Sequence, residues 1–194
     1  MNLRKTVEEL QNTPYASRKV VCVDELDNEM GVESLINAHR DPGIKHRAFS
    51  LNLYRVRDGK KELLLQKRAV EKPVFVLLWT NTCCYNMAPG EDYLPRAAER
   101  AWEEMGVRIS KDALRVLYRF SYYAPDIEGW CENEVDTIIV GEWDGEVNLN
   151  PTEAADHMWV DLATLESDMG KNPDFYAPWF KTIVSDSRFR SVFE

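Results

Sequence analysis

The sequence predicts an α/β protein in which helices pack on a mixed β-sheet, and three observations lead to this prediction. Short apolar stretches with the pattern of strands recur between residues 19 and 143. Residues 92–105 instead repeat apolar side chains at the period of a helix with one buried face. The chain has 194 residues, enough for one well-buried domain and short for two. We therefore expect a single domain over 1–194, with 1–18 as a helical N-terminal extension.

The first part of the chain is expected to alternate helices and strands. Apolar spacing predicts a short helix over 3–12, and "KVVCVDEL" (19–26) predicts a strand that ends in a turn. The segment 32–43 begins as a helix and must stop at its "DPG". The segments 46–56 and 62–68 flank the turn "RDGKK", and this arrangement predicts a hairpin.

The rest of the chain supplies further strands and the main helices. The apolar run 73–81 predicts a buried strand or extended segment, and the helix over 92–105 should end at Gly106. Beyond it we expect two strands, over 114–124 and 133–143. A strand that runs into a helix should follow over 157–169, and a last helix over 174–186.

Composition excludes several classes of function. The formal net charge of −9 argues against charge-driven binding to nucleic acid or anionic membrane. No apolar run reaches the length of a membrane span, and the N-terminus lacks the apolar core of a secretory signal, so we expect a cytoplasmic protein. The four cysteines form no CxxC pair, which excludes a zinc ribbon or thioredoxin motif, and we expect them to be thiols.

The segment from Tyr85 to Val107 resembles the Nudix box, written G-x5-E-x7-R-E-U-x-E-E-x-G-U. Its first acidic position is Glu91, and its end is matched by Ala101, Glu103, Glu104, Gly106 and Val107. Glutamates three or four residues apart share one helix face, where they can hold Mg²⁺ against a diphosphate. Three positions depart from the box, since Tyr85, Glu99 and Arg100 replace Gly, Arg and Glu. The box therefore indicates the fold more strongly than it indicates hydrolysis.

Two further patterns carry candidate metal ligands. In a strand "ENE" places Glu132 and Glu134 on one side, where two carboxylates need a cation or a shared proton. In "HRDPGIKH", His39 and His46 flank a loop, and neutral imidazoles suit Mn, Fe, Zn or Co. For each pattern alone a structural role is the commoner explanation: a solvent-facing strand edge for the glutamates, and structural histidines for His39 and His46.

Together these features resemble the type I isopentenyl diphosphate isomerase family, a branch of the Nudix fold. The family's parts occur in order from about residue 20 to 180: H-x6-H, K-R-A, W-T-N-x-C-C, the altered box, Y-x9-E-N-E and a late P-W. The resemblance implies a Nudix-type α/β/α sandwich. It also implies isomerisation of a small isoprenoid diphosphate, isopentenyl diphosphate, to dimethylallyl diphosphate by a monomer or homodimer.

The resemblance also implies roles for individual residues. Cys84 matches the family's catalytic acid/base, Glu134 the glutamate opposite it, Tyr122 an assisting tyrosine and Trp179 an active-site tryptophan. Two acid/base groups are what protonation of an alkene and removal of an allylic proton require. The neighbouring Cys83 is then expected to be packing.

The cations and anions of the site follow from the same resemblance. A first metal, Mn²⁺ or Zn²⁺, is implied at His39, His46, Glu132 and Glu134. A Mg²⁺ on the substrate's diphosphate is implied at Glu104. The basic residues implied to hold the diphosphate are Arg68, Lys72 and Arg100. A cation at position 100 favours holding a diphosphate over splitting it.

The chain departs from the family directly after Cys84. The family has Gly or Ser and then a histidine ligand, where this chain has Tyr85 and Asn86. An asparagine offers only a neutral oxygen, so we expect a weakened metal site. Leu35 stands where a lysine is expected, and a Pro-Gly turn before W-T-N is missing. Alternatives therefore remain open: a protonation-initiated cyclase of a longer prenyl diphosphate, a Nudix diphosphatase, or a binding protein without catalysis.

Overall fold

The computed structural model describes residues 7–194. It begins with helix α1 (Val7–Gln11), so the second half of the helix expected over 3–12 is present, and residues 1–6 lie outside the described part. A 3₁₀ turn, η1 (Pro14–Ser17), leads from α1 into the first strand. Among the described residues, no helix combines the length and apolar character needed to cross a membrane.

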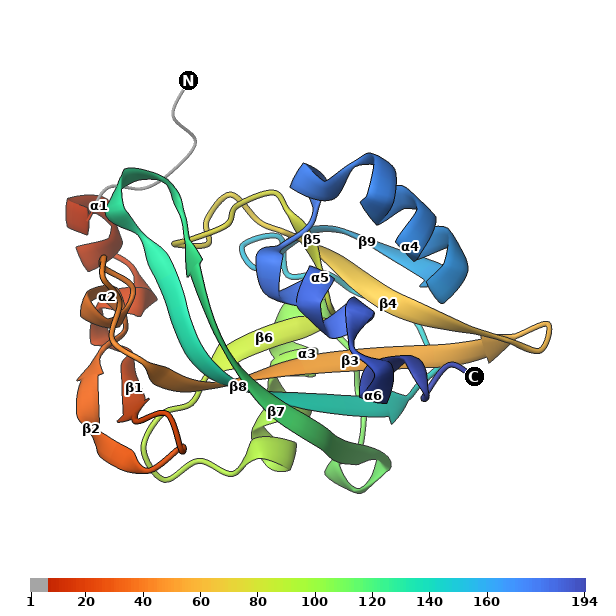
Figure 1. Cartoon of the computed structure of the whole chain (residues 1–194), viewed down its shortest axis with the longest axis horizontal. Helices are drawn as coiled ribbons and strands as arrows, with labels where there is room; N and C mark the ends of the chain where they lie inside the picture. Colours follow the sequence, from red (N-terminus) through yellow and green to blue (C-terminus); the bar gives the residue numbers. More distant parts are fainter. Residues whose placement is uncertain (1–6) are drawn as a thin grey trace.

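The strands form one mixed sheet around a long central strand (Figure 1). In chain order they are β1 (Lys19–Val23), β2 (Glu29–Ser34), β3 (His46–Arg57), β4 (Lys60–Arg68), β5 (Trp79–Thr80), β6 (Cys83–Asn86), β7 (Leu114–Pro125), β8 (Cys131–Glu142) and β9 (Ala154–Asp161). Strand β3 pairs in parallel with β8, and it pairs antiparallel with β1, β4 and β6. The predicted hairpin of β3 and β4 is confirmed.

Helices cover both faces of this sheet, as the predicted α/β/α sandwich requires. Besides α1 they are α2 (Leu35–Ala38), α3 (Tyr93–Met105), α4 (Leu162–Lys171), α5 (Pro178–Ser185) and α6 (Ser187–Arg190). In Figure 1, α5 and α6 lie in front of the sheet and α3 lies behind it. Each face buries its own apolar cluster, one with α3 and one with α4, α5 and α6.

Alternation along the strands divides side chains between these two clusters. On β4, Leu63 and Leu65 pack on the side of α4 and α5, whereas Leu64 between them packs on the side of α3. All three are at most 1 % exposed, and full burial of such a side chain is worth about 2 kcal/mol. Because side chains alternate along a strand, neighbouring residues belong to different layers.

The helix expected from Val32 is wrong at its start. Residues up to Ser34 belong to β2, which pairs antiparallel with β1, and only Leu35–Ala38 are helical. The Ser34 hydroxyl accepts a hydrogen bond from the Asn37 amide at 3.2 Å, so it caps the short helix. Pairing with β1 satisfies the preceding backbone groups, and the tertiary contact overrides the local helical pattern.

The strand or extended segment expected over 73–81 is also largely wrong. Only Trp79–Thr80 form a strand, and Phe75 and Leu77 have positive φ angles. The Arg68 guanidinium donates to the carbonyls of Val74 and Phe75 at 2.9 and 3.1 Å and holds this loop. Val74 and Phe75 are buried without a strand, and Pro73 and Val74 form a wall of the site described below.

Gly106 ends α3 as predicted, in a left-handed conformation with φ of 65°. A Cβ added there would lie 2.4 Å from the Asn148 carbonyl oxygen. We expect Gly106→Ala to lower the free energy of unfolding by about 2 kcal/mol or more. Urea unfolding measures this loss. Gly170→Ala is the control, since a Cβ there meets nothing within 4 Å; equal midpoints for the two variants would contradict the prediction.

Candidate active site

Most of the predicted site residues lie on one face of the sheet, where strand β3 runs between β6 and β8. Ser50 lies opposite Cys84 of β6, and His46 lies opposite Glu134 of β8. Residues opposite each other in neighbouring strands point to the same side, and so do residues two apart along one strand. The register therefore brings Cys84 and Glu134 into one pocket, which Trp179 of α5 also lines.

The same alternation separates the two adjacent cysteines. Cys83 is fully buried in the apolar cluster that packs on α3. Cys84 points to the opposite face and lines the pocket. All four cysteines are free thiols, as expected. The two cysteines therefore lie in different environments, a core and a cavity wall.

The Cys84 thiol is partly buried and lies among polar groups. It donates to Asn81 Oδ1 at 3.2 Å, and Ser50 Oγ lies 3.5 Å from the sulfur. Burial raises the pKa of Cys84 to about 12, and the neighbouring Asp136 adds to this effect. The thiol therefore keeps its proton at neutral pH, which suits a group that donates a proton to carbon.

Asn81 fixes the geometry around this thiol. Its Oδ1 also accepts from the Trp179 indole nitrogen at 3.2 Å, and its Nδ2 donates to the Leu51 and Cys83 carbonyls. Trp179 is 2 % exposed and lines the same pocket. One amide thus positions both the thiol and the tryptophan ring.

Glu134 and Tyr122 form the other wall. The Tyr122 hydroxyl donates to Glu134 Oε2 at 2.5 Å, and the Tyr122 ring centroid lies 6.0 Å from that of Trp179. Burial and the charge of Glu132 raise the pKa of Glu134. Burial and the charge of Glu134 raise the pKa of Tyr122 well above its usual value. The pocket thus joins a thiol, a carboxyl group and two aromatic faces.

Four buried groups beside this wall offer ligands for one cation. Their donor atoms all lie within 4.8 Å of one another, and the residues are His39, His46, Glu132 and Glu134. His39 and His46 each place Nδ1 2.7 Å from a backbone carbonyl, which can only accept. Each Nδ1 therefore carries the hydrogen, and each Nε2 turns its lone pair toward the carboxylates.

The donor set fits a divalent metal ion. Glu132 Oε2 lies 2.9 Å from His39 Nε2, yet it receives no hydrogen bond from the described residues. Two acceptors at this distance need a proton or a cation between them. Burial opposes ionisation of Glu132, but a positive charge on its neighbour, supplied by a protonated His39, outweighs burial and lowers the pKa of that carboxyl group. Nitrogen and carboxylate ligands together suit Mn²⁺, Zn²⁺ or Mg²⁺.

Asn86 reaches the same cluster. Its Nδ2 donates to Glu134 Oε1 at 2.7 Å and lies 3.1 Å from His46 Nε2. In this orientation the amide hydrogens point at His46 Nε2 and Glu134 Oε1, two atoms that would bind the metal. Asn86 would offer its own oxygen to a metal only if the amide were flipped. Both orientations make Asn86 a poorer ligand than an imidazole.

The predicted diphosphate residues line the pocket, and buried carboxylates neutralise two of them. Lys72 Nζ lies 3.1 Å from Glu104 Oε2, and Arg100 pairs with Glu104 and with Glu153, the latter at 3.3 Å. Burial alone would raise the pKa of Glu104, but Lys72 and Arg100 lower it. Glu104 is fully buried and lies outside the His/Glu cluster, and its two oxygens accept from Lys72 and Arg100. Arg68 stacks its guanidinium 5.4 Å from the Trp179 ring centre.

Sequence reasoning missed several residues that shape the site. Asn81 is part of the "WTN" motif, but the sequence does not indicate its hydrogen bonds to Cys84 and Trp179. Ser50 donates to Asp136 Oδ2 at 2.8 Å, and burial with the charge of Glu134 raises the pKa of Asp136 well above its usual value. The alternation Glu132, Glu134, Asp136 is the signal that places this third carboxyl group on the same face.

Comparisons with known proteins agree with this architecture. The model of the NUDIX domain family matches residues 46–182. The chain is similar to Isopentenyl-diphosphate Delta-isomerase 1 of Aromatoleum aromaticum, with 40% identity over 86% of this chain and 90% of that protein. It is also similar to Isopentenyl-diphosphate Delta-isomerase of Nocardia farcinica, with 38% identity over 88% of this chain and 96% of the relative.

Solved structures support the fold alone. A crystal structure of a Deinococcus radiodurans protein aligns with a TM-score of 0.68 and 18% identity, over 86% of this chain and 97% of that one. The NUDIX domain of Shewanella oneidensis NrtR aligns with a TM-score of 0.55 and 15% identity, over 75% and 87% respectively. The sheet, helix α3 of the Nudix-box segment and the similarity to relatives over most of their length all support the same family assignment. The chain belongs to the Nudix family and, within it, to the isopentenyl-diphosphate Delta-isomerase family.

Proposed function

We propose that this protein isomerises isopentenyl diphosphate to dimethylallyl diphosphate. The observation that carries the proposal is that Cys84 and Glu134 line two walls of the same cavity. A thiol that keeps its proton and a carboxyl group supply the two proton transfers that the reaction needs. The names of the relatives agree with this reaction.

In the proposed reaction Cys84 donates its proton to the terminal CH₂ carbon of the alkene. The π electrons form the new C–H bond, and a tertiary carbocation remains. Glu134, oriented by the Tyr122 hydroxyl, removes a proton from the allylic carbon, and those electrons form the new double bond. The substrate neither gains nor loses atoms. Transfer of a proton back from Glu134 to Cys84 through solvent resets the site.

The aromatic groups support the cationic intermediate. Trp179 and Tyr122 present π faces to the cavity, and these attract positive charge. Burial of Trp179 and the loop at Val74 keeps water from capturing the cation. A pocket that excludes water also favours loss of a proton from the intermediate over addition of water to it.

The charged groups of the site would hold the diphosphate. Arg68, Lys72 and Arg100 line the pocket and would bind the phosphate oxygens. A divalent ion at His39, His46, Glu132 and Glu134, and Mg²⁺ at Glu104, would neutralise charge and fix orientation. A cytoplasmic location and a monomeric or homodimeric state remain predictions.

A product assay tests the proposal. The protein with Mg²⁺ is incubated separately with C5, C10, C15 and C20 prenyl diphosphates, and products are identified by mass spectrometry. We expect dimethylallyl diphosphate from the C5 substrate and no change in the longer ones. A cyclic product would replace the proposal with a cyclase, and free phosphate would replace it with a hydrolase.

Asn86→His should strengthen metal binding at the His/Glu cluster. The imidazole would exchange an amide for a nitrogen ligand next to His46 and Glu134. We expect the dissociation constant for Mn²⁺, measured by competition with a chelator, to fall about tenfold or more. Asn12→His adds a histidine at an exposed position and serves as the control. Equal affinities in the two variants would contradict the placement of Asn86 in the metal site.

A further inference from the structure

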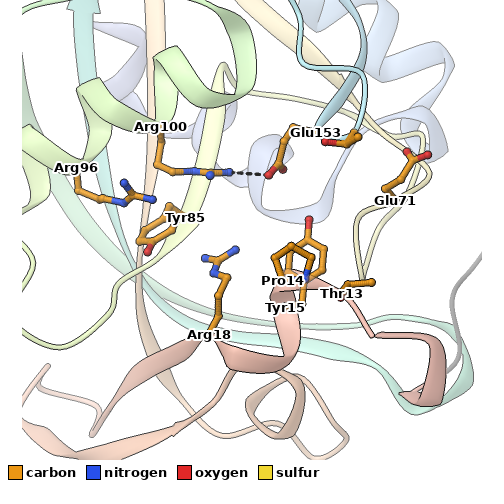
Figure 2. Close-up of a pocket in the computed structure, with 10 residues that line it drawn as sticks. Thr13, Pro14, Tyr15, Arg18, Glu71, Tyr85, Arg96, Arg100 and Glu153 are labelled. Atoms are coloured by element: carbon orange, nitrogen blue, oxygen red, sulfur yellow. Dashed lines mark ion pairs between the residues drawn. The ribbon is translucent and has the colours of Figure 1, made fainter. Parts of the chain in front are cut away.

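A second and larger cavity adjoins the catalytic pocket. The catalytic pocket encloses only about 40 Å³, whereas the adjoining one, here called the outer chamber, encloses about 450 Å³. Tyr15, Arg18, Tyr85 and Arg100 line both cavities, so these side chains form the boundary between them. Figure 2 shows Arg18 pointing into the space between Tyr85 and Tyr15.

Three guanidinium groups surround the ring of Tyr85 at this boundary. The Cζ atoms of Arg96, Arg18 and Arg100 lie 4.4, 4.6 and 5.3 Å from the ring centroid. The ring attracts each cation through its π face, but the three like charges repel one another. Such a cluster in a chain of net charge −9 needs anionic partners.

Two of the three cations have such partners within the protein. Arg96 pairs with Glu99 and Glu103 at 2.9 and 3.1 Å, and Arg100 pairs with Glu103 at 2.6 Å. Arg18 forms no ion pair with any acidic group among residues 7–194. Glu71 lies across the chamber from Tyr85 in Figure 2. Arg18 is therefore a half-buried cation that forms no ion pair with the described acidic side chains.

The position of Arg18 is defined by its backbone and by the ring beneath it. The Arg18 amide donates to the Tyr15 carbonyl at 3.3 Å, and the Arg18 carbonyl accepts from the Leu35 amide at 2.9 Å. Tyr85 is 8 % exposed, and its hydroxyl donates to Glu91 at 3.1 Å. A fixed backbone and a fixed ring preorganise the guanidinium for a ligand.

We propose that Arg18 binds the outer phosphate of the substrate's diphosphate in the outer chamber, with Tyr85 as the platform for its guanidinium. This inference rests on the proposed function. The catalytic pocket is far smaller than the roughly 300 Å³ of an ordinary ligand site. The hydrocarbon end must reach Cys84, so the diphosphate extends past Arg100 toward the chamber. A planar guanidinium that forms no ion pair within residues 7–194 matches a phosphate oxygen pair.

Binding of inorganic diphosphate, followed by calorimetry in the presence of Mg²⁺, tests the role of Arg18 directly. We expect Arg18→Gln to raise the dissociation constant about tenfold or more, and Arg18→Lys to raise it less. Lys19→Gln removes the same charge from the next residue, which is exposed, and should leave the constant within about twofold. Equal effects of Arg18→Gln and Lys19→Gln, or no effect of either, would overturn the proposal.

Steady-state kinetics and substitutions of Tyr85 provide a second test of the role of Arg18. For isopentenyl diphosphate, Arg18→Gln should raise KM about tenfold and leave kcat within about threefold, because the outer phosphate is remote from the reacting carbons. Tyr85→Leu should weaken diphosphate binding, and Arg18→Gln should then add little, whereas Tyr85→Phe keeps the platform. A fall in kcat with unchanged KM would contradict the binding role.

The two proposals fail in different ways. If the protein binds inorganic diphosphate through Arg18 but produces no dimethylallyl diphosphate, the proposed reaction is wrong and the phosphate site stands. If it produces dimethylallyl diphosphate and Arg18→Gln changes neither the dissociation constant nor KM, the reaction stands and the role of Arg18 is wrong.

Discussion

Cys84→Ala is expected to lower kcat/KM for isopentenyl diphosphate by at least about 10³-fold. The substitution removes the proton donor. No second thiol lines the pocket among residues 7–194, because Cys83 points to the opposite face of the sheet. Asn81 and Trp179 should keep their mutual hydrogen bond, since it does not involve the sulfur. A radiometric or coupled assay of dimethylallyl diphosphate formation measures the loss.

Cys83→Ala is the matched control for this experiment. It removes the same atom from the adjacent residue, within the apolar cluster on α3. We expect it to cost about 1 kcal/mol of stability and to leave most of the activity. Comparable losses of activity in both variants, with both still folded by circular dichroism, would rule out Cys84 as the acid.

Glu134→Gln should produce the second large effect, a loss of about 10²- to 10⁴-fold in kcat. The amide cannot accept the allylic proton, and it weakens a ligand of the predicted metal. Tyr122→Phe removes only the 2.5 Å hydrogen bond to Glu134 and should cost less. Both variants are assayed at saturating Mn²⁺ or Mg²⁺, so that reduced metal affinity does not determine the rate. Retention of full activity by Glu134→Gln would contradict its role as the base.

Much of the fold is predictable because its signals are local and periodic. The helix over 92–105 shows a clear apolar face, and Gly106 supplies the left-handed residue that ends it. The pattern "ENE" places Glu132 and Glu134 on one side whatever the strand pairs with. His39 and His46 are predicted as metal ligands only by the family resemblance, because no local pattern distinguishes them from structural histidines.

The remaining features depend on contacts between distant segments. Residues 73–81 are as apolar as a strand, but Arg68 and Asp126 hold the loop through its backbone, with the Asp126 carboxylate accepting from the Phe75 amide at 2.8 Å. The bridge from Cys84 through Asn81 to Trp179 joins residues almost a hundred positions apart in the chain. The place of Arg18 over Tyr85 depends on how the N-terminal segment packs.

Proton NMR in D₂O tests the central claim, that Cys84 and Glu134 exchange protons with one allylic carbon skeleton. Isopentenyl diphosphate is incubated with the protein and Mg²⁺, and the product is followed over time. We predict dimethylallyl diphosphate that carries deuterium in a methyl group, with both phosphates retained, and no such product with Cys84→Ala. Unlabelled substrate after long incubation, or release of phosphate instead of allylic product, would contradict the assignment.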